Sequence, residues 1–150
     1  WLGPATWDVI HFNWGLHDLK YMGPKGENLA DPLDPDSRQK VPPALYEKNL
    51  TTLVESLGMT NARLVWCNTT PVPAGADGRV PGDAAKYNAI AEPIMHSRGI
   101  GIDDLFGCAA PRLRAIQQPR NVHFTEGGYE ILATHVAACI EETMRIKHES

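Results

Sequence analysis

The sequence has few cysteines, no excess of positive charge and no long apolar run, and each absence excludes a class of protein. Its three cysteines form no CxxC pair and no metal-ligand spacing, so they indicate neither a disulfide framework nor a metal centre. The formal net charge of −4 argues against a nucleic-acid-binding surface. No apolar run approaches the ~20 residues that cross a bilayer, which predicts a soluble protein without a membrane span. We expect no cofactor and no bound metal.

The composition that is present fits one folded domain. The chain has 150 residues, of which 43% are hydrophobic and 21% are charged. Both fractions are ordinary for a globular protein, and the length suits a single domain over residues 1–150. The sequence starts at Trp1 with neither Met nor a signal peptide, so the compartment stays open. Removal of a signal peptide would imply a secreted or periplasmic protein.

Strand-like and helical patterns alternate along the chain. Three short apolar segments have the character of buried strands, at 8–13, 62–67 and 100–102. Each is followed by a helical pattern. The first helix has Pro43 in its first turn and Gly58 as its C-terminal cap. The second has Asp83 as its N-cap and a kink at Pro93, and the third has Thr125 as its N-cap. Residues 19–43 lack periodicity and read as a long surface loop.

This alternation predicts an α/β fold, a parallel sheet with helices on both faces. Ligands of such sheets bind beyond the carboxyl ends of the strands. Polar clusters stand at those ends, at 13–18, 68–70 and 103–104, and His123 precedes the last helix. The candidate site therefore lies at this edge of the sheet.

Two polar segments suit acyl-transfer chemistry. An imidazole changes its protonation near neutral pH, so His123, just before a capped helix, suits a general base. A lone histidine is more often structural, which is the alternative here. The segment from Phe12 to Asp18 offers an amide, an imidazole and backbone N–H groups at a strand-to-loop turn, as an oxyanion hole requires. Its alternative is a turn in which Asp18 caps a short helix.

Taken together, the motifs resemble the carboxyl-terminal two-thirds of an SGNH (GDSL-type) hydrolase. Val9-Ile-His-Phe-Asn-Trp-Gly-Leu-His-Asp-Leu19 is similar to that family's third block, a strand that ends in Gly-x-Asn-Asp. Val122-His-Phe-Thr-x-x-Gly-Tyr129 is similar to its fifth block, which carries the catalytic histidine. Further matches lie between these blocks: Val65-Trp-Cys-Asn-Thr-Thr-Pro71, Tyr87-Asn88 and Asp104-Leu105.

The resemblance implies a three-layer α/β/α sandwich of the flavodoxin-like SGNH type that lacks the family's first strands. It also implies an ester hydrolase acting on small acyl esters, often acetyl groups on carbohydrates. In that mechanism a serine attacks the carbonyl, His123 removes its proton, and Asn13 or His17 stabilises the oxyanion. His17 occupies the position of the family's oxyanion asparagine, and Asn13 is the alternative amide donor.

The sequence departs from the family at the nucleophile. The first block, Gly-Asp-Ser, is absent, and none of the chain's serines has that context; they are Ser37, Ser56, Ser97 and Ser150. Three routes stay open: a separate amino-terminal segment, an inactive remnant, or another attacking group. Candidates for the last are a water activated by His123 and the side chains of Cys67, Thr69, Thr70 and Thr125.

A second departure concerns the partner of His123. The family places Asp three residues before the histidine, where this chain has Arg120 followed by Asn121. A cation or an amide cannot stabilise an imidazolium as a carboxylate does. His123 would then rely on a backbone carbonyl, on Asn121 or on Glu126.

The resemblance also predicts an exposed sheet edge. Without the family's first strand, the strand at 8–13 becomes an edge that is apolar on both faces. Edges of this kind recruit partners, so we expect a homo-oligomer, strand exchange, or pairing with an amino-terminal segment.

Two other functions are open. One is a non-catalytic remnant that binds a ligand or a partner segment, with a cleft that aromatic side chains would line: Trp14, Tyr21, Trp66 and Phe124. The other is a metal-dependent hydrolase that uses His11, His17, Asp18 and His123, although no HxH or HExxH spacing supports it.

Overall fold

A parallel sheet of three strands forms the centre of the molecule. The computed structural model describes residues 2–3 and 5–145. The strands are β1 (Val9–Phe12), β4 (Arg63–Cys67) and β5 (Gly101–Asp103), and they pair in the order β1-β4-β5. The predicted α/β class and the three predicted strands are confirmed.

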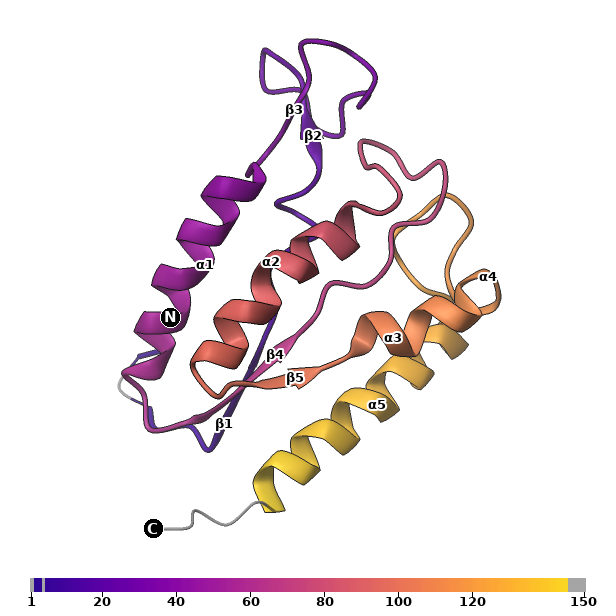
Figure 1. Ribbon diagram of the computed structural model, residues 1–150. Helices are drawn as coiled ribbons and strands as arrows, with labels where there is room; N and C mark the ends of the chain where they lie inside the picture. Colours follow the sequence, from indigo (N-terminus) through magenta and orange to yellow (C-terminus); the bar gives the residue numbers. More distant parts are fainter. Residues whose placement is uncertain (1, 4, 146–150) are drawn as a thin grey trace.

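Helices cover both faces of this sheet (Figure 1). Side chains alternate between the faces of a strand, so Ile10, Phe12 and Trp66 enter a core with α1 (Pro43–Gly58) and α2 (Asp83–Ser97). The alternate positions face α5 (Glu126–Arg145), which contacts β1 and β4. Three layers result, α1 and α2 over one face and α5 over the other.

Three short helices lead from β5 to α5, and a second apolar cluster lies beneath them. They are α3 (Leu105–Ala109), η1 (Ala110–Arg112) and α4 (Leu113–Ile116). The buried members of the cluster come from these helices, from α5 and from the loop before it: Ala109, Ile116, Phe124 and Leu132. This cluster fixes the loop that carries His123.

The segment 19–43 is not the structureless loop that its composition predicts. It contains a small antiparallel pair, β2 (Tyr21–Met22) and β3 (Arg38–Gln39). Leu19 at its start is fully buried, and the N–H of Tyr21 donates to the carbonyl of Gly78. Strands of two residues are too short for a periodic pattern to reveal them, which explains the error.

Two of the four predicted helix boundaries are confirmed and two are shifted. Pro43 lies in the first turn of α1, and the N–H of Gly128 donates to Thr125 Oγ1 in a cap of α5. The cap of α2 is Gly82, in a left-handed conformation with φ 91°, and not Asp83. The Asp83 carboxylate instead accepts bonds from Gln39 and Lys86. Gly58 is the last residue of α1, with Met59 as its cap.

The strand β1 lies at the outer edge of the sheet, as predicted. One face of β1 is apolar and buried, at Ile10 and Phe12. The other face is not wholly apolar, because it carries His11, which bonds to Asp103. Among the described residues, no helix combines the length and the apolar character that crossing a membrane requires.

Candidate active site

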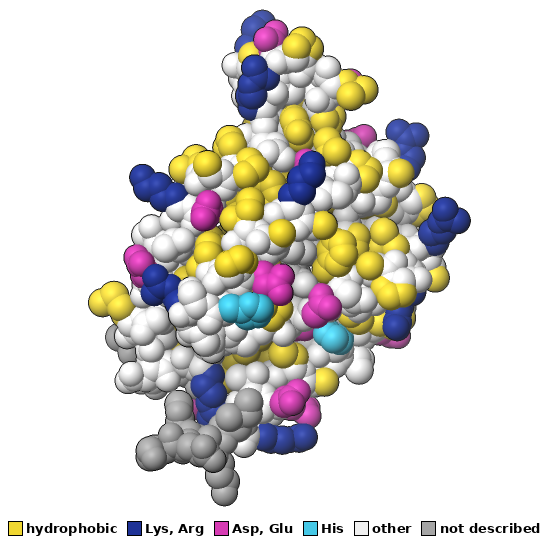
Figure 2. All heavy atoms as spheres, in the orientation of Figure 1, with side chains coloured by type: hydrophobic (Ala, Val, Ile, Leu, Met, Phe, Trp, Pro, Cys, Tyr) yellow, Lys and Arg dark blue, Asp and Glu magenta, His cyan; other side chains and the backbone are white. Residues whose placement is uncertain are grey.

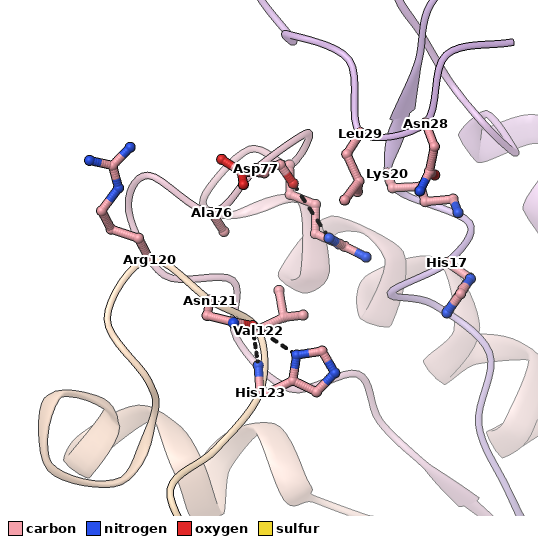
Figure 3. A pocket seen from close by; sticks show the side chains of 11 residues that line it. His17, Lys20, Asn28, Leu29, Ala76, Asp77, Arg120, Asn121, Val122 and His123 are labelled. Carbon is pink, nitrogen blue, oxygen red and sulfur yellow. Dashed lines mark hydrogen bonds between the residues drawn. The ribbon is translucent and has the colours of Figure 1, made fainter.

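Four parts of the chain meet at a pocket of about 310 Å³ beyond the carboxyl ends of β1 and β4. They are the turn after β1, the loop after β4, the loop before α5 and, at Asn28 and Leu29, the segment between β2 and β3. Both predicted histidines line this pocket, His17 from the first loop and His123 from the third. Figure 3 shows the ring of His123 pointing across the pocket toward the side that holds His17 and Lys20.

The loop that carries His123 is held by glutamine side chains. Gln117 is buried, and its amide donates to the carbonyl oxygens of Pro71, at 3.0 Å, and Val122, at 3.3 Å. The amide of Gln118 donates to the carbonyl of Phe124. These bonds fix the backbone on both sides of His123, so the imidazole projects from a rigid support.

Asn121 sets the tautomer of His123. Its Oδ1 accepts a hydrogen bond from the backbone N–H of His123, at 3.0 Å, which identifies this atom as the amide oxygen. The same oxygen lies 2.8 Å from Nδ1 of the ring. An oxygen acceptor requires Nδ1 to carry the hydrogen, so in the neutral ring Nε2 is the basic nitrogen. Figure 3 draws both bonds.

Of the three partners considered for His123, the structure thus provides Asn121. Arg120, which stands where the family has Asp, turns away from the imidazole (Figure 3). Its Nε donates to the carbonyl of Gly75, at 3.4 Å, and its φ of 56° lies in the left-handed region. A residue with a Cβ rarely adopts that conformation, and such strain concentrates at functional sites.

His17 stands on a tight turn after β1. The N–H groups of Asp18 and Leu19 both donate to the carbonyl of Gly15. Gly15 packs against Thr69 so closely that a Cβ would overlap the threonine side chain. This contact requires glycine and fixes the turn, which directs His17 into the pocket.

Asn13, the other predicted oxyanion donor, does not line the pocket. Its amide nitrogen donates to the carbonyl of Cys67, at 2.6 Å, and to Thr69 Oγ1, at 3.2 Å. Both amide hydrogens are thereby engaged. In this structure Asn13 joins the ends of β1 and β4, and an oxyanion would have to displace one of these bonds.

The hydroxyl and thiol candidates differ in availability. Thr69 is buried and bonded to Asn13, and Thr125 is occupied as a helix cap. Burial raises the pKa of the Cys67 thiol to about 12, so it stays protonated and is a poor nucleophile. Thr70 lines an apolar groove together with His123.

The serines provide no activated hydroxyl in the described part of the chain. Ser56 and Ser97 donate to backbone carbonyls of their own helices. Ser37 is buried beside β3, and it does not line the pocket. Ser150 lies outside the described residues.

An apolar groove of about 480 Å³ adjoins His123 on the side of α5. Its lining includes Leu16, Val122, Phe124 and Leu132. Of the four aromatic residues predicted to line a cleft, Phe124 lines this groove. Trp66 is instead fully buried in the core.

Trp14 lies against α1 and accepts a hydrogen bond from Tyr46 at its carbonyl. Tyr21 belongs to β2 and lines neither the pocket nor the groove. Neither aromatic ring therefore contributes to the surface around His123.

The predicted metal set is not brought together. Within the described part of the chain, the group of histidine, cysteine and acidic residues close enough for one ion is His11, Cys67 and Asp103, under α5. Nitrogen, sulfur and carboxylate donors suit zinc. Here, however, His11 Nε2 lies 2.7 Å from Asp103 Oδ2, and the Cys67 thiol is protonated.

His135 on α5, whose side chain is 40% exposed, lies beside this cluster. Its Nε2 lies 3.0 Å from Asp103 Oδ1, although that oxygen accepts no well-directed hydrogen bond. Through the fully buried Asp103 carboxylate, the cluster brings β1, β5 and α5 into contact. It lies on the opposite side of the sheet from α1 and α2.

Several polar residues that were not among the predicted site residues also shape the site. Asn88 on α2 receives the N–H of Thr69 and donates to its carbonyl, which fixes the loop after β4. Lys20 and Arg79 line the pocket beside His17. The dipeptide Tyr87-Asn88 signalled the first of these, but nothing in the sequence places Lys20 and Arg79 together.

The charge on the visible face of the molecule is dispersed. Figure 2 shows Lys and Arg side chains spread over this face, with Asp and Glu between them. This face has no basic stripe of the kind that binds nucleic-acid phosphates.

Comparison with solved structures identifies the fold as one found in hydrolases. No protein-family model and no curated protein sequence matches the chain. The lipase/acylhydrolase from Enterococcus faecalis is similar in structure, with a TM-score of 0.65 and 20% identity over 95% of this chain and 63% of that one. LAE5, an alpha/beta hydrolase enzyme from the metagenome of Lake Arreo, Spain, is also similar in structure. Its TM-score is 0.58, and it is 20% identical over 73% of this chain and 51% of that one. The chain spans less than two thirds of either protein.

Proposed function

We propose that this chain belongs to an SGNH-type ester hydrolase and supplies the general base and the oxyanion donor of an acyl transfer. The proposal rests on the motifs at both histidines and on the meeting of His17 and His123 in one pocket. It agrees with the similarity of the fold to a lipase/acylhydrolase. The substrates are small acyl esters.

The observation that carries the proposal is the contact of 2.8 Å between the Asn121 oxygen and Nδ1 of His123. The Asn121 oxygen holds the hydrogen on Nδ1 and leaves Nε2 as the proton acceptor toward the pocket. A base with this orientation removes a proton from an attacking hydroxyl and returns it to the leaving alcohol. In this role Asn121 orients the ring, as a carboxylate does in a Ser-His-Asp triad.

His17 is the oxyanion donor that the pocket favours. It faces the space next to Nε2 of His123, whereas the Asn13 amide is bonded to Cys67 and Thr69. An N–H aimed at the carbonyl oxygen stabilises the negative charge of the tetrahedral intermediate. Asn13 then acts as a positioning residue that keeps the ends of β1 and β4 together.

The attacking group is a hydroxyl that reaches Nε2 of His123. The two protein sources are a serine on an amino-terminal segment that pairs with β1, and Thr70 in the groove. A water activated by His123 would replace them without a covalent intermediate. These sources differ in whether the protein carries an acyl group during the reaction.

A serine-directed phosphonate tests the proposal. We expect covalent labelling of the protein that depends on His123, and mass spectrometry of the peptides names the residue that carries the label. The variant His123→Ala loses the label and His96→Ala, at an exposed histidine on α2, keeps it. Hydrolysis without a label indicates the activated water. If the protein shows neither labelling nor hydrolysis, the proposal is overturned.

A second function, binding of an ester or its product without catalysis, is favoured by one observation. No serine in the described part of the chain lines the pocket or the groove with His123. The same labelling experiment separates the two functions, because a binding remnant takes up no label while it still binds the ligand.

A further inference from the structure

The pocket that holds His123 is lined by positive charge that forms no ion pair within the described residues. Lys20 has 8% of its surface exposed, although lysine is almost never buried without a partner. In the described part of the chain its ammonium takes part in no hydrogen bond and no ion pair. Lys20 nevertheless lines the pocket, opposite His123 in Figure 3.

Arg79 adds a second cation to the same wall. Its Nε donates to the carbonyl of Leu16, at 3.1 Å, and its Nη1 donates to the carbonyl of Asp77, at 3.4 Å. These bonds orient the guanidinium without neutralising it, because both acceptors are backbone oxygens. The remaining N–H groups of Arg79 are available to the pocket.

The pKa values point in the same direction. Burial lowers the pKa of Lys20, and the nearby charges of Lys40 and Arg79 lower it further. Burial also lowers the pKa of Arg79. The one carboxylate on the pocket wall belongs to Asp77, which is exposed to water and forms no ion pair with either cation in the described residues. An anion in the pocket would relieve this cost.

We propose that Lys20 and Arg79 bind an anionic group on the alcohol half of the substrate, so that the substrates are acyl esters of an alcohol that carries a carboxylate, sulfate or phosphate. This specificity rests on the proposed ester hydrolysis. The apolar groove on the α5 side of His123 takes the acyl chain. The scissile carbonyl then lies between groove and pocket, at Nε2 of His123.

Binding is tested first, because it does not need catalysis. Glycolate and glycolamide are matched small alcohols that differ in charge. By isothermal titration we expect the chain to bind glycolate at least about tenfold more tightly, equivalent to ~1.4 kcal/mol. Inorganic phosphate and inorganic sulfate are titrated in the same way. The anion that binds most tightly identifies the anionic group that the pocket recognises.

The variants Lys20→Met and Arg79→Met should each lose about tenfold in anion affinity, with glycolamide unchanged. Lys48→Met is the control, because Lys48 is an exposed lysine on α1 and does not line the pocket. Met removes the charge and keeps the length of a side chain that is mostly buried, so we expect Lys20→Met to melt no lower than the unmodified chain. Equal binding of glycolate and glycolamide, or anion binding that neither variant weakens, overturns the proposal.

Hydrolysis separates this inference from the proposed function. Acetoxyacetate and acetoxyacetamide are the corresponding esters, and we expect kcat/KM to favour the first about tenfold, with the preference lost in Lys20→Met. Hydrolysis of both esters at equal rates through His123 refutes the anion specificity alone. Lys20-dependent anion binding without hydrolysis of any ester refutes the esterase and leaves the anion site.

Discussion

Asn121 illustrates how one side chain decides what a histidine can do. Its oxygen accepts two hydrogen bonds from His123, one from the backbone and one from the ring, so the orientation of the imidazole and its tautomer are set together. An amide oxygen carries no full charge, so it orients the ring but stabilises an imidazolium less than a carboxylate would. In the proposed reaction Asn121 would therefore orient the imidazole of His123 without supplying the negative charge of a carboxylate.

Replacing Asn121 should change the tautomer of His123. In Asn121→Ala the bond that selects Nδ1–H is gone, so the neutral ring of His123 should populate both tautomers. Asn121→Asp should keep the Nδ1–H form and retain activity. Nitrogen-15 NMR of the histidine ring measures the tautomers directly. An unchanged tautomer in Asn121→Ala would show that Asn121 does not set it.

Asp18, next to His17, predicts a dependence of stability on pH. Burial raises the pKa of Asp18 above its usual value, and the charges of Lys40 and His17 oppose this effect only in part. The folded chain then holds the proton more tightly than the unfolded chain does. Ionisation of Asp18 therefore lowers the free energy of unfolding as the pH rises through the raised pKa.

We expect Asp18→Asn to melt at a higher temperature than the unmodified chain at pH 7, because the amide cannot ionise. The difference should disappear near pH 3, where Asp18 is protonated in both states. Thermal unfolding monitored by circular dichroism across this range measures the effect. A gain that is larger at pH 3 than at pH 7 would have the wrong sign.

At the scale of the elements, the start of α5 determines where His123 lies. Thr125 caps the helix, and its Oγ1 also donates to the carbonyl of Ile116 on α4. Gly128, in the first turn of α5, packs directly on that carbonyl, and a Cβ there would overlap the oxygen. The helix approaches α4 so closely that this position requires glycine.

Two adjacent glycines therefore respond in opposite ways to alanine. Gly128→Ala should lower the free energy of unfolding by ~1–3 kcal/mol through overpacking against Ile116. A Cβ at Gly127 meets no atom within 4 Å. Gly127→Ala should therefore leave the free energy of unfolding unchanged or raise it by up to ~1 kcal/mol, because a helix prefers Ala to Gly. Chemical denaturation of both variants checks this, and equal effects would contradict the close contact.

The elements were predictable to the extent that periodicity and capping reveal them. Short apolar segments predicted the three sheet strands. Pro43 predicted the first turn of α1, and Thr125 predicted the cap of α5. The β2–β3 pair was not predictable, because it depends on contacts between residues far apart in the sequence. The N–H of Lys40 donates to the carbonyl of Lys20, and the N–H of Tyr21 donates to the carbonyl of Gly78.

In the site, too, some features were predictable from the sequence and others were not. Motifs located His17 and His123, whereas the engagement of Asn13 with Cys67 depends on how β1 and β4 end side by side. The convergence of Lys20 and Arg79 likewise depends on loop packing that no local pattern encodes.

At the scale of the whole molecule, β1 is the outer strand of a parallel sheet. Its burial alternates along the strand, with Ile10 and Phe12 in the core, and β4 occupies one of its two edges. Parallel sheets are usually covered and paired, so the other edge of β1 is suited to a further strand. The proposed amino-terminal segment and a second copy of the chain compete for it.

We therefore expect the chain to dimerise at micromolar concentration. Val9→Lys, which places a charge on the edge strand, should shift it toward the monomer, since charged side chains protect edges. Light scattering at several concentrations measures the mass. A monomer for the unmodified chain across this range would argue against pairing at β1.

If His123 is the base of an ester hydrolase, its removal should slow the hydrolysis of p-nitrophenyl acetate. Loss of a general base typically costs 10²–10⁴-fold, so His123→Ala should lose at least ~100-fold in kcat/KM. His96→Ala, at an exposed histidine, controls for unspecific reaction of imidazoles with the ester and should keep the full rate. Equal rates for the unmodified chain and His123→Ala would show that His123 is not the base.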